Sequence, residues 1–524
     1  MANQPIMVLV PDDRVRSWAL TAAEALRTQL DGVDLLRPGQ GVCASPQPWF
    51  EALERRLFGP PSSGHTDWAS TGSLPVLDLG SCEERIIVVN LTGHAPEELP
   101  ACLASAAVLS PLFEGQYRPE GIVSPLLAGD TPHLATVLTV RQKARLLHGA
   151  RIAIHDRHVM IRALDTVLAR TVELMVAATL HLHSHKPLPA AIQAPPKARG
   201  EFGSRTAVRQ VFRAYAPLIW NKLTAPVVRR DDWCIGLRAA PAGSAPPDLD
   251  LSPASFKLIE SPPDRFFADP ILIRHDGCTA LFFEDYDYTT RRGRISYVTV
   301  SDSGDHGEPA VALSRPCHLS YPFMFDHEGA ALMVPETSTN RTVELYEATA
   351  FPDGWRLRAV LMDDIEASDA TLHFDAGAGL WWMFATVTAF GSLAHDTLSL
   401  FFSGRLNGPW RAHPMNPVKC DRSSSRPAGP LVSANGRLLR PAQDCTNGYG
   451  SALAWCEIKE LTPTTFREEI VARQSPQAPF FGLHTYSRCG GFETVDFKRN
   501  RLRLRQGWSR SGKSNFSGTV QDTE

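Results

Sequence analysis

The chain lacks the paired cysteines, the leader and the long apolar run that mark a secreted, metal-binding or membrane-spanning protein. Its ten cysteines form no Cys-x-x-Cys pair, and the first apolar run, residues 6–10, stops at Pro-Asp-Asp without forming a signal-peptide core. The longest apolar candidate, residues 159–182, is interrupted by Arg162, Asp165, Arg170 and Glu173. We therefore expect reduced thiols, a cytoplasmic location and no membrane span.

The chain also lacks a strong excess of charge and a glycine-rich nucleotide motif. Its formal net charge is -3, which argues against a nucleic-acid partner. No Gly-x-Gly-x-x-Gly follows the first strand pattern, and no histidine pair has the spacing of metal ligands, so we expect no cofactor and no metal. Basic residues gather in residues 499–524, which we predict to be a disordered tail.

Residues 1–184 alternate strand and helix patterns and predict a Rossmann-like α/β domain. The run Arg-Ile-Ile-Val-Val-Asn at 85–90 is typical of a buried parallel strand. Further strands are expected at 6–10, 33–37, 105–112, 133–140 and 150–154, with helices at 17–30 and 159–182.

The order of these elements, with Asn90 and His94 after a central strand, resembles the methionyl-tRNA and sugar formyltransferases. That family carries an Asn-x-His pair with Ser-Leu-Leu-Pro, which polarises the formyl donor and takes the amine proton. Here the two residues are four apart and no Ser-Leu-Leu-Pro follows. The resemblance implies formyl transfer to an amino sugar as one function, and the alternative is that His94 is a loop histidine without a chemical role.

Residues 185–230 form a proline- and alanine-rich linker that ends in a bridging helix over 208–223. In residues 231–498 one unit recurs five times at a spacing of roughly 50–60 residues, which suits a four-stranded propeller blade. Each copy is a strand, a turn at glycine and a second aromatic-rich strand. We predict an all-β, five-bladed propeller, with a strand at 232–237 closing the ring through the last blade.

The innermost strands of a propeller converge on its axis, so a polar residue that opens each copy should face one central pocket. Asp269 opens the first copy and Asp369 opens the third. Their expected convergence is the main functional signal of the sequence. The alternative is that both carboxylates only accept hydrogen bonds from backbone amides.

At Phe-Ala-Asp-Pro, 267–270, the sequence resembles the five-bladed propellers of glycoside hydrolase families 32, 43 and 130. The resemblance implies that Asp269 is a base or nucleophile and that Asp369 orients the substrate or tunes a neighbouring pKa. The general-acid glutamate of those families falls on Ala428, which cannot donate a proton. Glu336 is the first candidate to replace it, ahead of these acids: Glu284, Asp287 and Asp444.

A second resemblance covers about residues 230–500, to the propeller at the N-terminus of plant glucosamine inositolphosphorylceramide transferases. It rests on several stretches taken together, among them 267–270, 318–322, 335–338, 426–429, 440–445 and Tyr449-Gly450. In the plant proteins a separate glycosyltransferase domain follows, and we expect none in this chain. The resemblance implies a carbohydrate-linked propeller.

The other polar residues of these stretches predict how a ligand is held. Arg426 and Arg440 are suited to bidentate hydrogen bonds with a carboxylate or phosphate of an anionic sugar. The alternative is that they pair only with Asp421 or Asp444. His318 and His484 open blades two and five and are candidate acids, bases or structural histidines. The full set of expected substrate-binding residues is Arg426, Arg440, Asp444, His318, Tyr321, Glu284 and His484.

We therefore expect a carbohydrate-active enzyme that transfers a glycosyl group to or from a sugar in the propeller centre. Asp269, Asp369 and Glu336 are its predicted catalytic residues. The alternatives are a non-catalytic glycan-binding or scaffold protein, a glycoside hydrolase with an atypical acid, and a sugar N-formyltransferase. The expected partner is a sugar, a nucleotide sugar or a glycan, and the sequence does not fix the oligomeric state.

Overall fold

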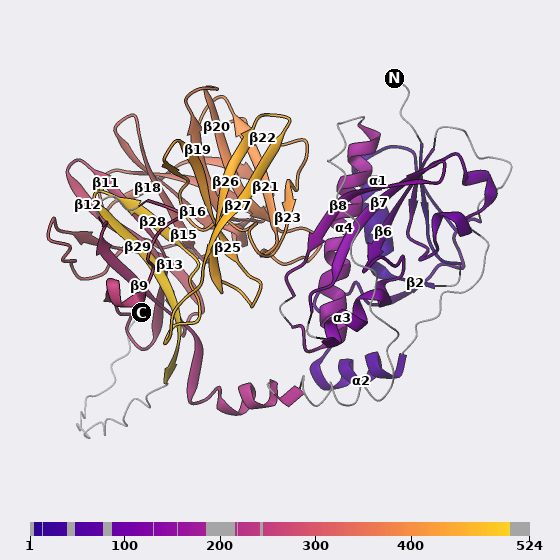
Figure 1. The fold of residues 1–524 in the computed structure, drawn as a ribbon, viewed down its shortest axis with the longest axis horizontal. Coiled ribbons are helices and arrows are strands. Elements are labelled where there is room, and N and C mark those ends of the chain that lie inside the picture. Colours follow the sequence, from indigo (N-terminus) through magenta and orange to yellow (C-terminus); the bar gives the residue numbers. More distant parts are fainter. Residues whose placement is uncertain are drawn as a thin grey trace, which may run out of the picture.

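The computed structural model describes residues 5–12, 14–38, 48–76, 86–128, 130–154, 156–184, 215–216, 218–241 and 245–502. An N-terminal α/β part and a C-terminal all-β part lie side by side (Figure 1). The predicted linker at 185–214 lies outside the described residues, and residues 218–224 of the predicted bridging helix are helical.

The N-terminal part is built on a six-stranded sheet of order β3-β1-β5-β6-β7-β8. The strands β3, β1, β5 and β6 are parallel, whereas β7 and β8 run antiparallel to their neighbours. The sheet is thus mixed, because β7 runs antiparallel to β6 and then forms a hairpin with β8. The strand bounds are β1 Ile6–Leu9, β3 Val33–Leu36, β5 Ile87–Asn90, β6 Ala107–Phe113, β7 His133–Val140 and β8 Lys143–Arg151.

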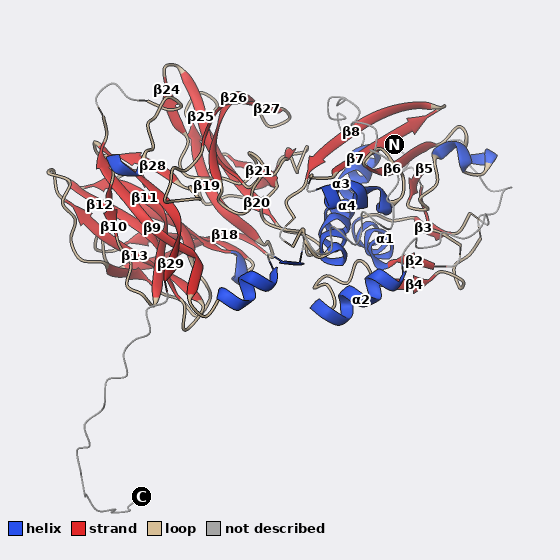
Figure 2. Cartoon of the chain, turned by 60° about the horizontal axis from the view of Figure 1, so that its bottom comes forward, coloured by secondary structure: helices blue, strands red, loops and turns tan. Residues whose placement is uncertain are grey.

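Helices pack on this sheet, and a small ribbon stands beside them (Figure 2). The helix α1 is rich in alanine, a strong helix former, and it buries its apolar face against α4. The ribbon of β2 and β4 is not predicted by the sequence, because both strands are only three residues long. The bounds are α1 Ser17–Gln29, α2 Pro48–Phe58, α3 Val123–Ala128, α4 Met160–His183, β2 Arg14–Arg16 and β4 Trp68–Ser70. Short 3-10 helices lie at Pro96–Glu98, Ala101–Leu103, Pro119–Ile122, Pro253–Ser255 and Ser338–Asn340.

Five sheets make the C-terminal part a five-bladed propeller, as the sequence predicts. Blades one to four run in chain order, and the fifth has the order β10-β9-β29-β28. The strands of blades one and two are β11 Arg265–His275, β12 Cys278–Asp287, β13 Arg292–Val300, β14 Ala310–Leu313, β15 Ser320–His327, β16 Ala330–Thr337, β17 Thr342–Ala348 and β18 Trp355–Asp363. Those of blades three and four are β19 Ala367–Asp375, β20 Leu380–Val387, β21 Thr397–Ser403, β22 Arg411–Ala412, β23 Lys419–Cys420, β24 Val432–Ala434, β25 Arg437–Asp444, β26 Ala452–Leu461 and β27 Phe466–Gln474. Blade five consists of β9 Val228–Ala239, β10 Lys257–Ile259, β28 Tyr486–Cys489 and β29 Phe492–Leu502.

The ring is closed by β9, which precedes the first blade in the chain but pairs with β29 of the last. This arrangement confirms the predicted closing strand and leaves neither of these two strands as a free edge. The strand β29 continues to Leu502, four residues into the predicted tail, where Arg499 pairs with Asp232 and Glu260. The remainder of that tail, residues 503–524, lies outside the described residues.

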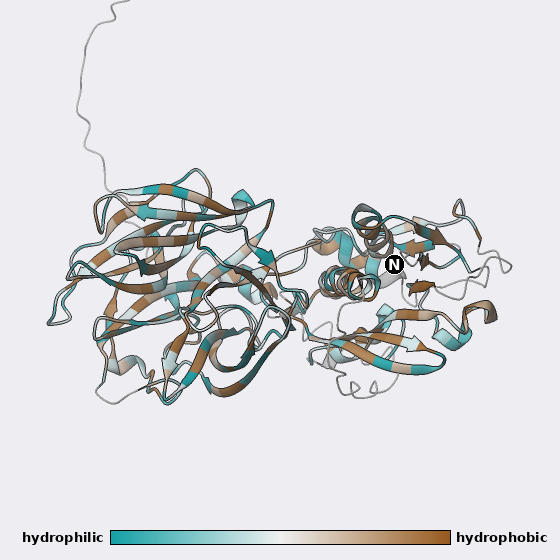
Figure 3. Cartoon of the chain, turned by 90° about the horizontal axis from the view of Figure 1, so that it is seen from above, coloured by the Kyte–Doolittle hydropathy of each residue, from teal (hydrophilic) through white to brown (hydrophobic). Residues whose placement is uncertain are grey.

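The hairpins follow the predicted turn chemistry. In the Asp-Gly turn at 276–277, the Glu-Gly turn at 328–329 and the Asn-Gly turn at 435–436, both residues have positive φ. Two successive positive φ values are the signature of type I′ turns, which match the twist of the flanking strands. Polar and apolar residues alternate along many blade strands, as the hydropathy colours of Figure 3 show.

The two parts are joined by a buried polar contact between α4 and the loop before β21. Arg170 of α4 donates to Asp396 Oδ1 at 2.5 Å and to the carbonyl of Leu393 at 2.7 Å. The amide of Ala153 donates to Asp396 Oδ2 at 2.8 Å, and Cys420 of the propeller belongs to the apolar core of the N-terminal part. The two parts therefore share a continuous interior. Among the described residues no helix is long and apolar enough to cross a bilayer.

Candidate functional site

A β-bulge with a left-handed residue lies in the first strand of each of blades one, two and three. Asp269, Tyr321 and Asp369 have φ values of 53°, 39° and 54°, and the pairing of each strand with the next skips that residue and the one after it. Such bulges re-aim side chains and are frequent beside active sites. A left-handed backbone is costly for a residue as bulky as tyrosine, so the surrounding contacts must hold it in place.

The second strand of each blade supplies further polar side chains. Glu284 of β12 lies opposite Ala268, and Glu336 of β16 lies opposite Ser320. All of the residues gathered here are buried or nearly so. We call the following set the central cluster: Asp269, Glu284, Glu336, Asp369, Arg426, His484 and Asp496.

Asp269, in blade one, is hydrogen-bonded to residues of blades two and five. Its Oδ1 accepts a hydrogen bond from Thr485 Oγ1 at 2.9 Å, and its Oδ2 accepts one from the amide of Tyr321 at 3.3 Å. Its own amide donates to Asp496 Oδ2 at 3.1 Å. Only the fold brings these residues together, and the carboxylate is fixed in position before any ligand arrives.

Asp369 is held by a bidentate ion pair. Arg426 donates from Nε to Asp369 Oδ2 at 2.5 Å and from Nη2 to Oδ1 at 3.1 Å, and Gln443 Nε2 donates to Oδ2 at 3.0 Å. The amide of Asp369 donates to Glu336 Oε2 at 3.2 Å. Arg426 also donates to the carbonyl of Ala394 at 2.7 Å. Most of its donors are thus satisfied inside the protein.

His484 lies between two carboxylates. Its Nδ1 is 2.5 Å from Asp496 Oδ2 and its Nε2 is 3.5 Å from Asp269 Oδ1. The ring stacks on Trp233 with the centroids 4.0 Å apart, and Tyr449 meets it edge-on at 5.2 Å. The half-buried Tyr449 ring also lies 5.1 Å from the Arg426 guanidinium carbon. Tyr449 therefore lies against the central cluster, and its side chain is partly exposed.

Asp269, His484 and Asp496 could also serve as metal ligands, because one donor atom from each lies within 4.8 Å of the others. The donor set of two carboxylates and an imidazole is suited to several divalent ions. In this arrangement, however, the imidazole nitrogens lie within ion-pair distance of the carboxylates, and this pairing alone accounts for the grouping.

Burial and mutual repulsion perturb the acids of the cluster. Burial, followed by the charges of Asp269, Glu336 and Asp369, raises the pKa of Glu284 well above its ordinary value. Burial also raises the pKa of Asp269, against the effect of His484, and raises the pKa of Asp369 to about 8, against the effect of Arg426. The cluster therefore retains protons near neutral pH, as acid–base chemistry requires.

Not every predicted site residue reaches the cluster. Arg440 donates to Glu468 and to the carbonyls of Ser424 and Ser425, within its own blade. Asp444 pairs with Arg473 on the same blade. His318 lies at the edge of the cluster, with Nε2 3.5 Å from Glu284 Oε1. Burial lowers the pKa of His318, which favours its neutral form.

Asn90 and His94, the pair predicted from the formyltransferase resemblance, contact each other and their own loop. Asn90 is buried, and its side-chain amide donates to the His94 carbonyl at 3.0 Å and to Ser110 Oγ at 3.1 Å. The His94 ring lies 3.3 Å from Glu98 on a short surface turn. Asn90 thus shapes the loop that carries His94.

The similarity of this chain to known protein families lies in the propeller. A family model described as glucosamine inositolphosphorylceramide transferase 1, N-terminal, matches residues 251–479. The transferase of that name from rice, Oryza sativa subsp. japonica, is 36% identical over 210 residues, which are 39% of this chain and 28% of the rice protein. The one from Arabidopsis thaliana is 31% identical over 210 residues, 39% of this chain and 27% of its own length. This chain resembles those transferases over the propeller. It spans less than a third of their length.

Two solved structures illustrate the likeness of fold. A family 117 glycoside hydrolase from Zobellia galactanivorans has a TM-score of 0.33 at 13% identity, covering 51% of this chain and 91% of its own. An exo-β-1,3-galactanase from Clostridium thermocellum has a TM-score of 0.33 at 12% identity, covering 50% and 65%. Both scores are low, and the propeller assignment rests on the five sheets themselves. Since the family match begins at residue 251, the Rossmann-like and formyltransferase-like interpretations of residues 1–184 stay predictions.

Several cluster residues were not predicted from the sequence. Gln443 stands beside Asp444 in a stretch that the sequence does single out, and only the fold shows that the glutamine, not the aspartate, contacts Asp369. Tyr449 precedes a glycine in another such stretch, where a side chain at Gly450 would strike Trp233 and His484. Asp496 carries no local signal in the sequence of β29, and only its burial in the structure shows that it needs a partner.

Proposed function

We propose that the centre of the propeller binds a sugar and that the protein transfers a glycosyl group to or from it. The observation that carries the proposal is the convergence of five carboxyl groups from four blades on one buried centre, where burial raises the pKa of Glu284. Glycosyl transfer requires a group that protonates the leaving oxygen and a carboxylate that activates or stabilises the reacting centre. The match to a transferase family supports the sugar as ligand.

In this proposal Glu284 is the proton donor and Asp269 is the base or nucleophile. Both Glu336 oxygens accept hydrogen bonds, from Ser338 Oγ and from the Asp369 amide. Glu336 therefore positions Asp369 and does not donate the proton, in contrast to the role expected from the sequence alone. Burial raises the pKa of Glu284, which favours the protonated form that a proton donor needs. A hydrolase would use the same two residues with water as the acceptor.

The charges of the cluster favour a neutral or amino sugar over an anionic one. Arg426 is engaged by Asp369 and by the Ala394 carbonyl, so an anionic group would have to displace these partners. Carboxyl groups outnumber the cationic groups, and an ammonium group on the sugar would reduce their repulsion. The names of the plant relatives include glucosamine, and we propose an amino sugar as the first ligand to test.

A non-catalytic sugar-binding module is the second candidate. It is favoured by Ala428, which stands where the related hydrolases carry an acid, and by the hydrogen bonds that already occupy the Asp269 and Asp369 oxygens. In such a module the cluster would hold the blades together and present its partly exposed side to a glycan.

Ligand binding is tested by thermal shift of the intact chain with glucosamine, N-acetylglucosamine, sugar phosphates and nucleotide sugars. A ligand at 100 times its dissociation constant stabilises the native state by about 2.7 kcal/mol. We expect a shift with at least one sugar that is lost in Tyr449→Ala, which removes a ring beside the cluster without breaking its ion pairs. Tyr117→Ala, in the N-terminal part, is the control and should keep the shift. The reverse pattern would contradict a sugar site in the propeller.

A further inference from the structure

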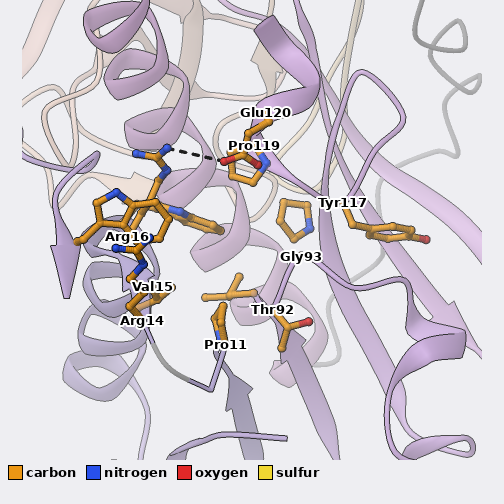
Figure 4. A pocket seen from close by; sticks show the side chains of 13 residues that line it. Pro11, Arg14, Val15, Arg16, Thr92, Gly93, Tyr117, Pro119 and Glu120 are labelled. Atoms are coloured by element: carbon orange, nitrogen blue, oxygen red, sulfur yellow. Dashed lines mark ion pairs between the residues drawn. The ribbon is translucent and has the colours of Figure 1, made fainter. Parts of the chain in front are cut away.

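The N-terminal part holds a pocket at the carboxyl ends of its parallel strands. The pocket lies between the residues that follow β1, at Pro11, and those that follow β5, at 91–93 (Figure 4). Its cavity volume is about 30 Å³, enough for the head of one oxyanion, and it opens to solvent. The sheet order β3-β1-β5 means that the chain leaves β1 toward one side and returns on the other. Such a switch point, outside the carboxyl ends of strands, is where open α/β sheets bind ligands.

Two arginines from the β2 strand give this pocket its charge. Arg14 and Arg16 lie two residues apart, so their side chains share one face of the ribbon. Their guanidinium carbons lie 4.6 and 4.5 Å from the centre of the Trp68 ring, which supports them by cation–π contact. The Trp68 ring keeps both guanidinium groups at the pocket wall, whereas arginine side chains without such a contact extend into solvent.

The two arginines differ in what they are bonded to. Arg16 is buried, with 3% of its side chain exposed, and pairs with Glu51 at 2.6 Å and with Glu120 at 3.7 Å. Its Nε–H is buried and has no hydrogen-bond acceptor among the described residues. Arg14 is exposed, and within the described ranges its one recorded contact is the Trp68 ring. The pocket therefore offers one exposed guanidinium fork, that of Arg14, and a second cation, Arg16, that is already paired.

We propose that this pocket is a second ligand site, separate from the propeller centre, and that it binds a small molecule through a phosphate or carboxylate group. The Arg14 fork matches the geometry of either oxyanion. The N-terminus of α1, which begins at Ser17, lies next to the same wall and adds a positive potential. Glu120 is the one acidic residue in the lining, and its partner Arg16 offsets its charge.

Isothermal titration of the intact chain tests the site, with inorganic phosphate, pyrophosphate and citrate as probes at constant ionic strength. We expect at least one probe to bind, and Arg14→Ala to raise its dissociation constant at least tenfold. Arg14→Lys keeps the charge but loses the fork, and should fall between the two. Arg56→Ala, an exposed arginine on α2, removes the same charge elsewhere and should bind like the parent.

The phosphate probes and the citrate probe distinguish a phosphorylated ligand from a carboxylate ligand. Binding of phosphate or pyrophosphate without citrate identifies a phosphorylated ligand, and the opposite pattern identifies a carboxylate. Absence of binding for all three probes would overturn the proposal, as would equal dissociation constants for Arg14→Ala and Arg56→Ala. Because these probes carry no sugar, the result is independent of the function proposed for the propeller.

Discussion

Replacing Glu284 with glutamine is expected to lower turnover by about two to four orders of magnitude, the usual contribution of a general acid. Glutamine preserves the shape of the side chain but cannot donate the proton to a leaving group. The affinity for the sugar should remain close to that of the parent, so the loss falls on kcat and not on KM. Asp287→Asn, on the same strand, is the matched control, because Asp287 only accepts hydrogen bonds from the amides of its own turn.

The same variant reports on the pKa of Glu284 through stability. Because burial raises that pKa, the folded state favours the neutral form, and its contribution to stability is lost as pH rises from the unfolded value toward the folded one. Each pKa unit corresponds to about 1.4 kcal/mol. The melting temperature of Glu284→Gln relative to the parent should therefore increase from pH 5 to pH 8. A difference that does not change with pH, together with full turnover, would remove Glu284 from the mechanism.

Replacing Arg170 with methionine is expected to destabilise the chain by about 3–5 kcal/mol, the cost of removing one partner from a buried ion pair. Arg170 and Asp396 are each only 1% exposed, and Glu173 is a second acidic partner of Arg170. Burial already raises the pKa of Asp396 and of Glu173, and without Arg170 both acids lose their cation. The midpoint of urea denaturation measures the effect.

This contact also connects the N-terminal part to the central cluster. Arg170 binds the Leu393 carbonyl and Asp396, and between them the Ala394 carbonyl accepts from Arg426. Hydrogen exchange of residues 389–396 should therefore rise in Arg170→Met. Arg162→Met, on the same helix, breaks a partly exposed pair and should cost only about 1 kcal/mol or less. Equal destabilisation by the two variants would show that the contact does not hold the parts together.

Much of the fold follows from local patterns. The Asp-Gly, Glu-Gly and Asn-Gly turns and the alternating strands predict the blades, because turn chemistry and strand periodicity act over a few residues. The mixed N-terminal sheet was harder to predict, since β7 runs antiparallel to β6 and the following β7–β8 hairpin turns at Arg141 and Gln142, where no glycine marks the turn. The β2–β4 ribbon, which forms one wall of the N-terminal pocket, joins segments separated by two helices and a strand and is too short to leave a pattern.

The sequence indicates where the candidate site lies, but it does not show which of its side chains pair with one another. The bulges place Asp269 and Asp369 at the centre, as their place in the repeat indicates. Arg440 and Arg426 are alike in the sequence, yet one is bound to Glu468 and the other to Asp369. Which arginine faces the axis depends on strand register and on neighbours from other blades. Residue type alone cannot supply that information.

The most direct test of the central claim is to locate the bound sugar by hydrogen–deuterium exchange of the intact chain, with and without the sugar that gives the largest thermal shift. We predict protection in the segments that open the blades, 266–272, 318–323 and 482–487, and around Tyr449. Protection confined to residues 5–184, with these segments unchanged, would contradict a sugar site in the propeller.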